Sequence, residues 1–162
     1  MKHTISILVE NHAGVLARVA GLFARRGFNI DSLAVGITED EKISRITIIA
    51  DGTAYTLEQI EKQLNKLIDV IKVRHLPAEE LLSRELVLIK VACQPSQRAE
   101  LISLAEIAKA KISDITVNTM TLELSDSVPR IKTFEELLRP YGIKETVRTG
   151  SIAMQKGGAS MK

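Results

Sequence analysis

Apolar and polar residues alternate near the start of the chain, and the spacing then becomes helical. Ile5, Ile7 and Val9 alternate with polar positions, which is typical of a half-buried strand. The apolar positions that follow lie three and four residues apart: Val15, Leu16, Val19, Leu22 and Phe23. This spacing predicts a helix with one apolar face. Gly27 stands where a glycine commonly ends a helix. The pattern therefore predicts a strand, a tight turn and an amphipathic helix.

A second group of elements follows at once. The expected strand, strand, helix and strand cover residues 30–36, 43–50, 56–67 and 70–76. We expect Thr56 to cap the helix, and Ile71 and Val73 to face the core. The order of elements is βαββαβ, which predicts a ferredoxin-like unit with a four-stranded antiparallel sheet under two helices.

The same order repeats, more weakly, in the second half of the chain. Pro77 and the acidic residues after it interrupt the pattern, so a linker is expected over residues 78–84. Further strands are expected at 86–92, 112–117, 120–124 and 143–148, with helices that begin near Ser96 and Ser127. We therefore predict an α+β protein of two tandem ferredoxin-like domains. The domains are expected over residues 1–77 and 85–150, and a frayed tail over residues 151–162.

The turn before the first helix is the best candidate for a ligand site. A helix start leaves backbone N–H groups without partners and favours a negative charge, and Gly14 has no Cβ to block a carboxylate. We expect Asn11 to cap this helix and Asn29 to re-enter the sheet across from the same turn. Two amide oxygens beside a helix start suit a zwitterion, such as an amino acid. Each residue also has a purely structural explanation, as a cap, a turn or a strand start.

Composition narrows the possible functions. The 22 basic and 20 acidic residues are well mixed and leave a net charge of +2, which gives no argument for a nucleic acid or an anionic membrane. We expect no signal peptide and no membrane span, because charged residues interrupt the apolar runs. The single Cys93 excludes an intrachain disulfide and fits a reducing cytoplasm, and we expect it to be a small buried hydrophobe.

We find no catalytic motif in the sequence. Walker A, GxGxxG and GxSxG patterns are absent, and His3, His12 and His75 are not spaced as metal ligands. His12 is the one titratable residue in the candidate turn, and no orienting acid is evident near it in the sequence. We therefore expect no catalysis and no bound metal.

The candidate turn resembles a known family. The segment NHAGVLARVAGLFARRGFNIDSLAVG is similar to the ACT-domain signature of the regulatory small subunit of acetohydroxyacid synthase, also called acetolactate synthase. The resemblance extends over nearly the whole chain, including the REL–VL–KV start of the second half and the closing VRTGSIAM. It implies that the first domain is an ACT domain.

The resemblance also implies a role. Subunits of this family have no activity of their own; they form homodimers, activate a cytoplasmic catalytic large subunit and confer feedback inhibition by valine or another branched-chain amino acid. The effector would lie between two ACT domains, with these residues shared between the two chains: Asn11, His12, Ala13, Gly14, Val15 and Leu16 from one, Asn29 and Ile30 from the other. Thiamine diphosphate, magnesium and FAD would belong to the catalytic partner, and this chain would hold no cofactor.

Three other functions remain open. An ACT-type sensor of amino acids could regulate a different partner enzyme. A βαββαβ sheet also builds RNA-recognition modules, but these stack bases on aromatic residues, and the central strands here carry none. A stand-alone enzyme of ferredoxin-like fold would need a catalytic set that the sequence does not show.

Overall fold

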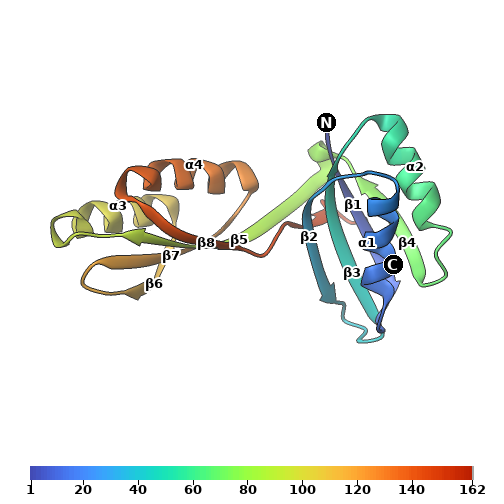
Figure 1. Ribbon diagram of the computed structural model, residues 1–162, viewed down its shortest axis with the longest axis horizontal. Helices are drawn as coiled ribbons and strands as arrows, with labels where there is room; N and C mark the ends of the chain where they lie inside the picture. Colours follow the sequence, from blue (N-terminus) through green and yellow to red (C-terminus); the bar gives the residue numbers. More distant parts are fainter. Residues whose placement is uncertain (162) are drawn as a thin grey trace. The chain divides into compact units, whose positions relative to one another are not determined.

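The computed structural model describes residues 1–161 and divides the chain into two compact units (Figure 1). The first unit comprises Met1–Ser83 together with the chain from Ser151 onward, and the second comprises Arg84–Gly150. Each unit has its own core of buried aliphatic side chains.

The first unit has the predicted element order. Its elements are β1 (Lys2–Glu10), α1 (Val15–Arg25), β2 (Ile30–Ile37), β3 (Ile43–Asp51), α2 (Ala54–Leu64) and β4 (Val70–Leu76). The strands form an antiparallel sheet in the order β2-β3-β1-β4, so β2 and β4 are the edges. Both helices cover one face of this sheet (Figure 1).

Alternation along the central strands separates two chemically different faces. Ile5, Ile7, Ile46 and Ile48 are at most 1% exposed and pack in one cluster with the apolar side of α1. The residues between them point to the helix-free face, because successive side chains of a strand lie on opposite sides. This second face carries polar and cationic side chains, among them Ser6, Arg45 and Arg74.

The second unit repeats the arrangement. Its elements are β5 (Leu81–Ala92), α3 (Arg98–Ala108), β6 (Lys111–Ile115), β7 (Thr119–Asp126), α4 (Val128–Leu138) and β8 (Ile143–Arg148), with strand order β6-β7-β5-β8. Short 3-10 turns occur at Ala78–Glu80, Pro95–Gln97 and Arg139–Tyr141. Cys93 is fully buried in this core, as expected. Two tandem ferredoxin-like units, the fold class predicted from the sequence, are confirmed.

The end of the chain differs from the prediction. Residues 151–161 form no frayed tail: β9 (Ile152–Gln155) pairs with β5, and Met161 is only 7% exposed. Arg45 Nη2 donates to the Ala153 carbonyl at 2.7 Å, and Arg74 Nη1 donates to the Ser160 carbonyl at 2.8 Å. Cations on the helix-free face of the first unit therefore hold this segment in place. The expected linker over residues 78–84 also contains the start of β5, at Leu81.

Several predicted details at the ends of elements are wrong. Helix α2 begins at Ala54, because the Thr53 hydroxyl accepts from the Thr56 amide, so Thr56 is not the cap. Val73 packs against the core as predicted, but Ile71 is 52% exposed, because a register shift in the β1–β4 pairing brings Val70 to the core in its place. In the second unit a capping box between Gln94 and Gln97 replaces the expected Ser96 cap.

Within residues 1–161, no helix is long and apolar enough to span a bilayer.

Candidate functional site

The turn between β1 and α1 is held by backbone hydrogen bonds and ends in a left-handed glycine. The Asn11 amide donates to the Lys42 carbonyl at 2.8 Å, and the His12 amide donates to the Glu10 carbonyl at 3.2 Å. Gly14 has φ 88° and stands directly before the first residue of α1. L side chains rarely adopt this conformation, so glycine is required here for the turn as well as for access. Residues 11–14 are all exposed, which leaves the helix start open to a ligand.

Asn11 has a different role from the one predicted. The side chain does not cap α1, which has no side-chain hydrogen bond at its start. Its Nδ2 donates instead to the Glu41 carbonyl in the β2–β3 turn, at 2.8 Å. The NH2 group of the side-chain amide points to Glu41, and the Oδ1 atom is left to accept from a ligand. The acceptor role expected of Asn11 therefore remains compatible with the structure.

A cation that the sequence analysis did not connect to this turn lies beside the helix start. Arg18 donates to the Oδ2 atom of Asp69 from Nε at 2.7 Å and lies within 2.6 Å of it through Nη2. The remaining nitrogen, Nη1, lies 3.2 Å from the place that a Cβ on Gly14 would take. A helical side chain points back toward the helix start, so an arginine four residues after the glycine was the available signal. Its positive charge adds to the helix dipole and favours a carboxylate.

Asp69, in the turn directly before β4, fixes this arrangement. It is only 6% exposed, and its carbonyl accepts from the Glu10 amide at 2.9 Å. Its two carboxylate oxygens serve different cations: Oδ2 contacts Arg18, and Oδ1 lies 2.9 Å from His12 Nε2. The position of Arg18 at the helix start is therefore set by a buried acid.

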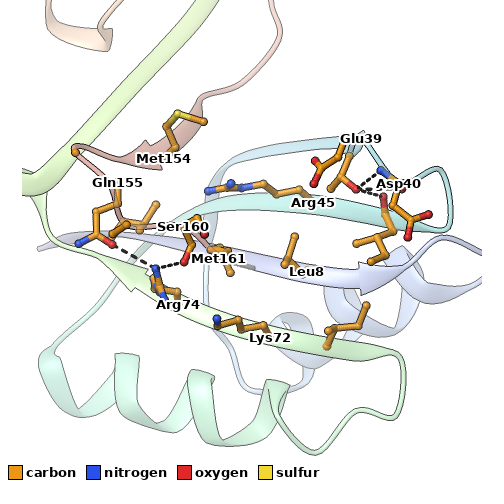
Figure 2. Close-up of a pocket in the computed structure, with 16 residues that line it drawn as sticks. Leu8, Glu39, Asp40, Arg45, Lys72, Arg74, Met154, Gln155, Ser160 and Met161 are labelled. Carbon is orange, nitrogen blue, oxygen red and sulfur yellow. Dashed lines mark hydrogen bonds between the residues drawn. The ribbon is translucent and has the colours of Figure 1, made fainter.

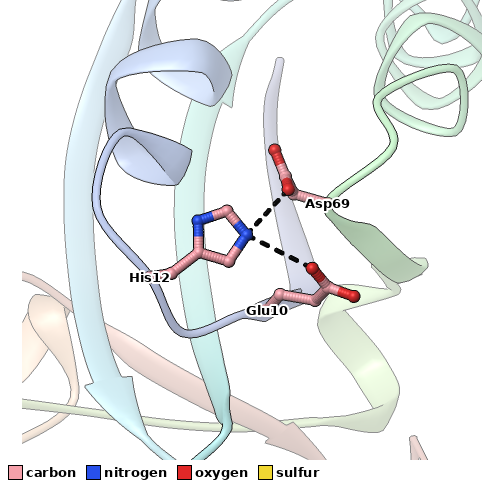
Figure 3. A group of neighbouring side chains, drawn as sticks. All are labelled: Glu10, His12 and Asp69. Atoms are coloured by element: carbon pink, nitrogen blue, oxygen red, sulfur yellow. Dashed lines mark hydrogen bonds and ion pairs between the residues drawn. The ribbon is translucent and has the colours of Figure 1, made fainter.

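His12 has acidic neighbours that the sequence did not reveal. Its Nε2 lies 3.2 Å from the Glu10 carboxylate as well as near Asp69, and its Nδ1 lies 3.2 Å from the Ala13 carbonyl (Figure 3). These contacts raise the pKa of His12, chiefly through the Ala13 carbonyl and further through Glu10 and Asp69. No orienting acid was evident near His12 in the sequence, but the structure places Glu10 and Asp69 beside it, because the pairing of β1 with β4 brings Asp69 next to the turn.

Glu10, His12 and Asp69 also come close enough to share a cation. One ligand atom from each lies within 4.8 Å of the others. Two observations favour an ion-pair cluster over a metal centre. Arg18 already pairs with Asp69, and the raised pKa of His12 favours the protonated imidazole, which cannot bind a metal. We assign no metal to these residues.

Asn29 and Ile30 lie at the far end of the same sheet. Ile30 pairs with Ala50, whereas Asn11 follows Glu10, which pairs with Ile43. Ile43 and Ala50 are seven residues apart along β3, a distance of roughly 23 Å at about 3.3 Å per residue. The prediction that Asn29 lies across from the turn of its own chain is therefore wrong. Its Nδ2 donates to Asp31 Oδ1 at 2.9 Å, which again leaves the amide oxygen as the acceptor.

Comparison with known proteins identifies the family. Residues 5–72 match the AHAS small subunit-like ACT domain, and residues 84–157 match the small subunit of acetolactate synthase. The chain belongs to the acetolactate synthase small-subunit family. A probable acetolactate synthase small subunit from Archaeoglobus fulgidus is 50% identical over 157 residues, which are 97% of this chain and 98% of that protein. The small subunit from Mycobacterium leprae is 44% identical over 96% of this chain and 92% of that protein.

Solved structures agree with this assignment. The crystal structure of the acetolactate synthase small subunit from Thermotoga maritima matches with a TM-score of 0.92 at 38% sequence identity, and the match covers 98% of this chain and 99% of that one. The resemblance stated from the sequence is thus confirmed. In the present chain, the ACT-domain match includes the turn at residues 11–16 together with Arg18, Asn29 and Ile30.

Proposed function

We propose that this small subunit is a non-catalytic regulator of acetolactate synthase. It binds the large catalytic subunit, raises its activity, and makes it sensitive to feedback inhibition by valine or another branched-chain amino acid. The family supports this role. The observation that carries the proposal is the combination at the start of α1: a left-handed Gly14, an Asp69-bound Arg18 and an Asn11 with its amino group engaged.

The charges at this turn suit an amino acid. The first N–H groups of α1 and the guanidinium of Arg18 provide donors for a carboxylate. The amide oxygens of Asn11 and Asn29 provide acceptors for an ammonium group. Leu16 is 41% exposed in the first turn of the helix and offers apolar contact to an aliphatic side chain. A branched-chain amino acid has all three of these groups.

A homodimer would complete the site. Edge strand β2 exposes Leu33, Val35 and Ile37, at 36%, 47% and 62%, and an apolar open edge is a ready surface for pairing with another strand. Antiparallel pairing of two β2 strands about a two-fold axis places the Asn29 end of one sheet beside the Asn11 end of the other. Both asparagines then reach one ligand, and the dimer has two equivalent sites.

The chemistry of the reaction would lie in the partner. We propose that thiamine diphosphate, magnesium and FAD are held by the catalytic subunit, and that this chain contributes no catalytic residue. Its own regulatory site would act by changing the interaction between the two kinds of subunit.

The test combines binding and activity. Calorimetry on the purified chain with valine, leucine and isoleucine measures the effector, and assays of the large subunit with and without this chain measure activation and inhibition. We expect at least one of the three amino acids to bind and to inhibit only the mixture. Binding without any effect on the large subunit would instead favour a sensor for a different partner enzyme. Absence of both binding and activation would contradict the proposal.

A further inference from the structure

A pocket lies on the helix-free face of the first sheet, opposite α1 and α2. It has a volume of about 650 Å³, within the range of small-molecule sites. Strands β1, β3 and β4 form its floor, and the segment after Ser151 forms its wall (Figure 2). All of its lining residues belong to the first unit. The described lining residues include none of the turn at residues 11–16, so the pocket is separate from that turn.

The lining joins cationic side chains to an apolar surface. Arg45, Lys72 and Arg74 are its three cations, and Glu39 and Asp40 are its acids. Figure 2 shows Arg45 and Lys72 extending from their strands toward the end where Arg74 lies, with Asp40 at the other end. The rest of the lining is largely aliphatic or thioether: Leu8, Ile43, Ile71, Leu76, Met154 and Met161.

The two arginines lack a negative partner among residues 1–161. Arg45 donates to the Ala153 carbonyl, and Arg74 donates to the Ser160 carbonyl and, at 3.3 Å, to the Gln155 side chain. All of these acceptors are neutral. Burial, and next the charge of Arg74, lower the pKa of Arg45, so an anion placed between the two guanidinium groups would relieve both effects.

Two buried polar atoms on this face also lack a partner. Arg45 Nε and Ser6 Oγ are shielded from solvent, and neither has a hydrogen-bond partner in the described part of the chain. Ser6 is fully buried and pairs with Arg74 across the sheet. Buried polar groups are nearly always satisfied in proteins, because an unmade hydrogen bond is costly. Of these two residues, Arg45 lines the pocket, and its contact with the closing segment leaves its Nε atom unmatched.

We propose that this pocket binds a small organic anion, whose carboxylate or phosphate head lies at Arg45 and Arg74 and whose apolar body lies against Leu8, Ile71 and Met161. Arginine pairs well with either head group through two parallel N–H donors. The aliphatic floor favours a ligand with a hydrocarbon part over a bare inorganic ion. The site differs from the effector site in location, and it does not require a second copy of the chain.

Calorimetry with three probes tests the proposal on the full chain at low ionic strength: hexanoate, its neutral analogue hexanamide, and inorganic phosphate. We expect hexanoate to bind once per chain and hexanamide to bind at least about tenfold more weakly, because a charge-assisted pair is lost. Phosphate binding as tightly as hexanoate would assign a phosphate head, and weaker phosphate binding would assign a carboxylate. If neither anion binds, the proposal is wrong.

Variants locate the bound anion. Arg74→Gln should weaken hexanoate binding about tenfold or more, with Lys72→Gln as a second variant if the first does not fold. Glu39→Gln should leave binding equal or tighter, because it removes a negative charge from the lining. Arg26→Gln, at the end of α1 on the other face, is the matched control and should bind as the natural chain does. Unchanged binding by Arg74→Gln and Lys72→Gln, or displacement of hexanoate by valine, would overturn the assignment.

Discussion

Asn11 and Asn29 lie at opposite ends of one four-stranded sheet, next to Ile43 and Ala50 of the same central strand. The roughly 23 Å between these positions is too far for one amino acid to bridge. If both asparagines contact a single effector, they must come from different chains.

Gly14→Asp should abolish feedback inhibition and leave activation of the large subunit largely intact. The new carboxylate would stand beside Arg18, occupy that cation and repel the carboxylate of the effector. The positive φ of 88° adds backbone strain of about 1–2 kcal/mol. Gly14→Ala has the same strain without the charge, so it is the control and should lose less sensitivity. Valine inhibition that persists unchanged in Gly14→Asp would refute this placement of the carboxylate.

Arg18→Gln should weaken effector binding by about tenfold or more, because a charged donor at the helix start is lost. It should also destabilise the fold, since the carboxylate of Asp69, which is 6% exposed, would lose its contacts with the guanidinium. Arg25 is a suitable control: its Nη1 lies 3.1 Å from the place of a Cβ on Gly21, a similar geometry about two helix turns further along α1. Arg25→Gln should bind effector normally. Equal binding by both variants would exclude Arg18 from the site.

The pKa values of His12 and His75 should be shifted in opposite directions. Contacts with the Ala13 carbonyl, Glu10 and Asp69 raise the pKa of His12 above 6.5, whereas burial and the nearby His3 lower that of His75. Protonated His12 therefore contributes stability that is fully present below pH 6.5 and is lost as the pH rises through its raised pKa. NMR titration of the imidazole signals measures both values. Asp69→Asn should move the His12 midpoint down, and a His12 midpoint below that of His75 would contradict the structure.

Removal of the chain after Gly150 should destabilise the first unit selectively. The segment buries Ala153 and Met161 and accepts hydrogen bonds from Arg45 and Arg74, so its loss should cost roughly 2–4 kcal/mol. The domain bounds expected from the sequence, residues 1–77, omit this segment, which belongs to the first unit. Hydrogen exchange provides the measurement, with the second unit as an internal control: amides of β1 and β4 should exchange faster, and those of β7 should not. Equal protection of β1 in both chains would show that the segment contributes nothing.

The arrangement of elements could be predicted from the sequence because both sheets have one buried face. The apolar residues at every second position of β1, and the three-and-four spacing in α1, are local signals that tertiary packing did not override. Element ends were less predictable, because neighbouring polar residues compete for the same cap. Thr53 rather than Thr56 caps α2 for this reason.

Contacts between distant positions could not be predicted in the same way. Arg18 and Asp69 are 51 residues apart, and only the pairing of β1 with β4 brings them together. Arg45 and Ala153 are 108 residues apart, and the glycine-rich stretch that follows Ala153 is typical of a free tail. Neither pair has a local signature in the sequence. The candidate turn was therefore found from its glycine and asparagine, whereas its arginine and acid required the structure.

The most direct test of the shared effector site is calorimetry with valine on a mixture of Asn11→Ala and Asn29→Ala chains. Each variant alone should bind about tenfold to a hundredfold more weakly, because the ammonium group loses an acceptor. Statistical exchange makes about half of the dimers mixed, and each mixed dimer has one intact and one doubly altered site, so about a quarter of all sites should regain full affinity. A mixture that shows no tight site after complete exchange would contradict a site built from two chains.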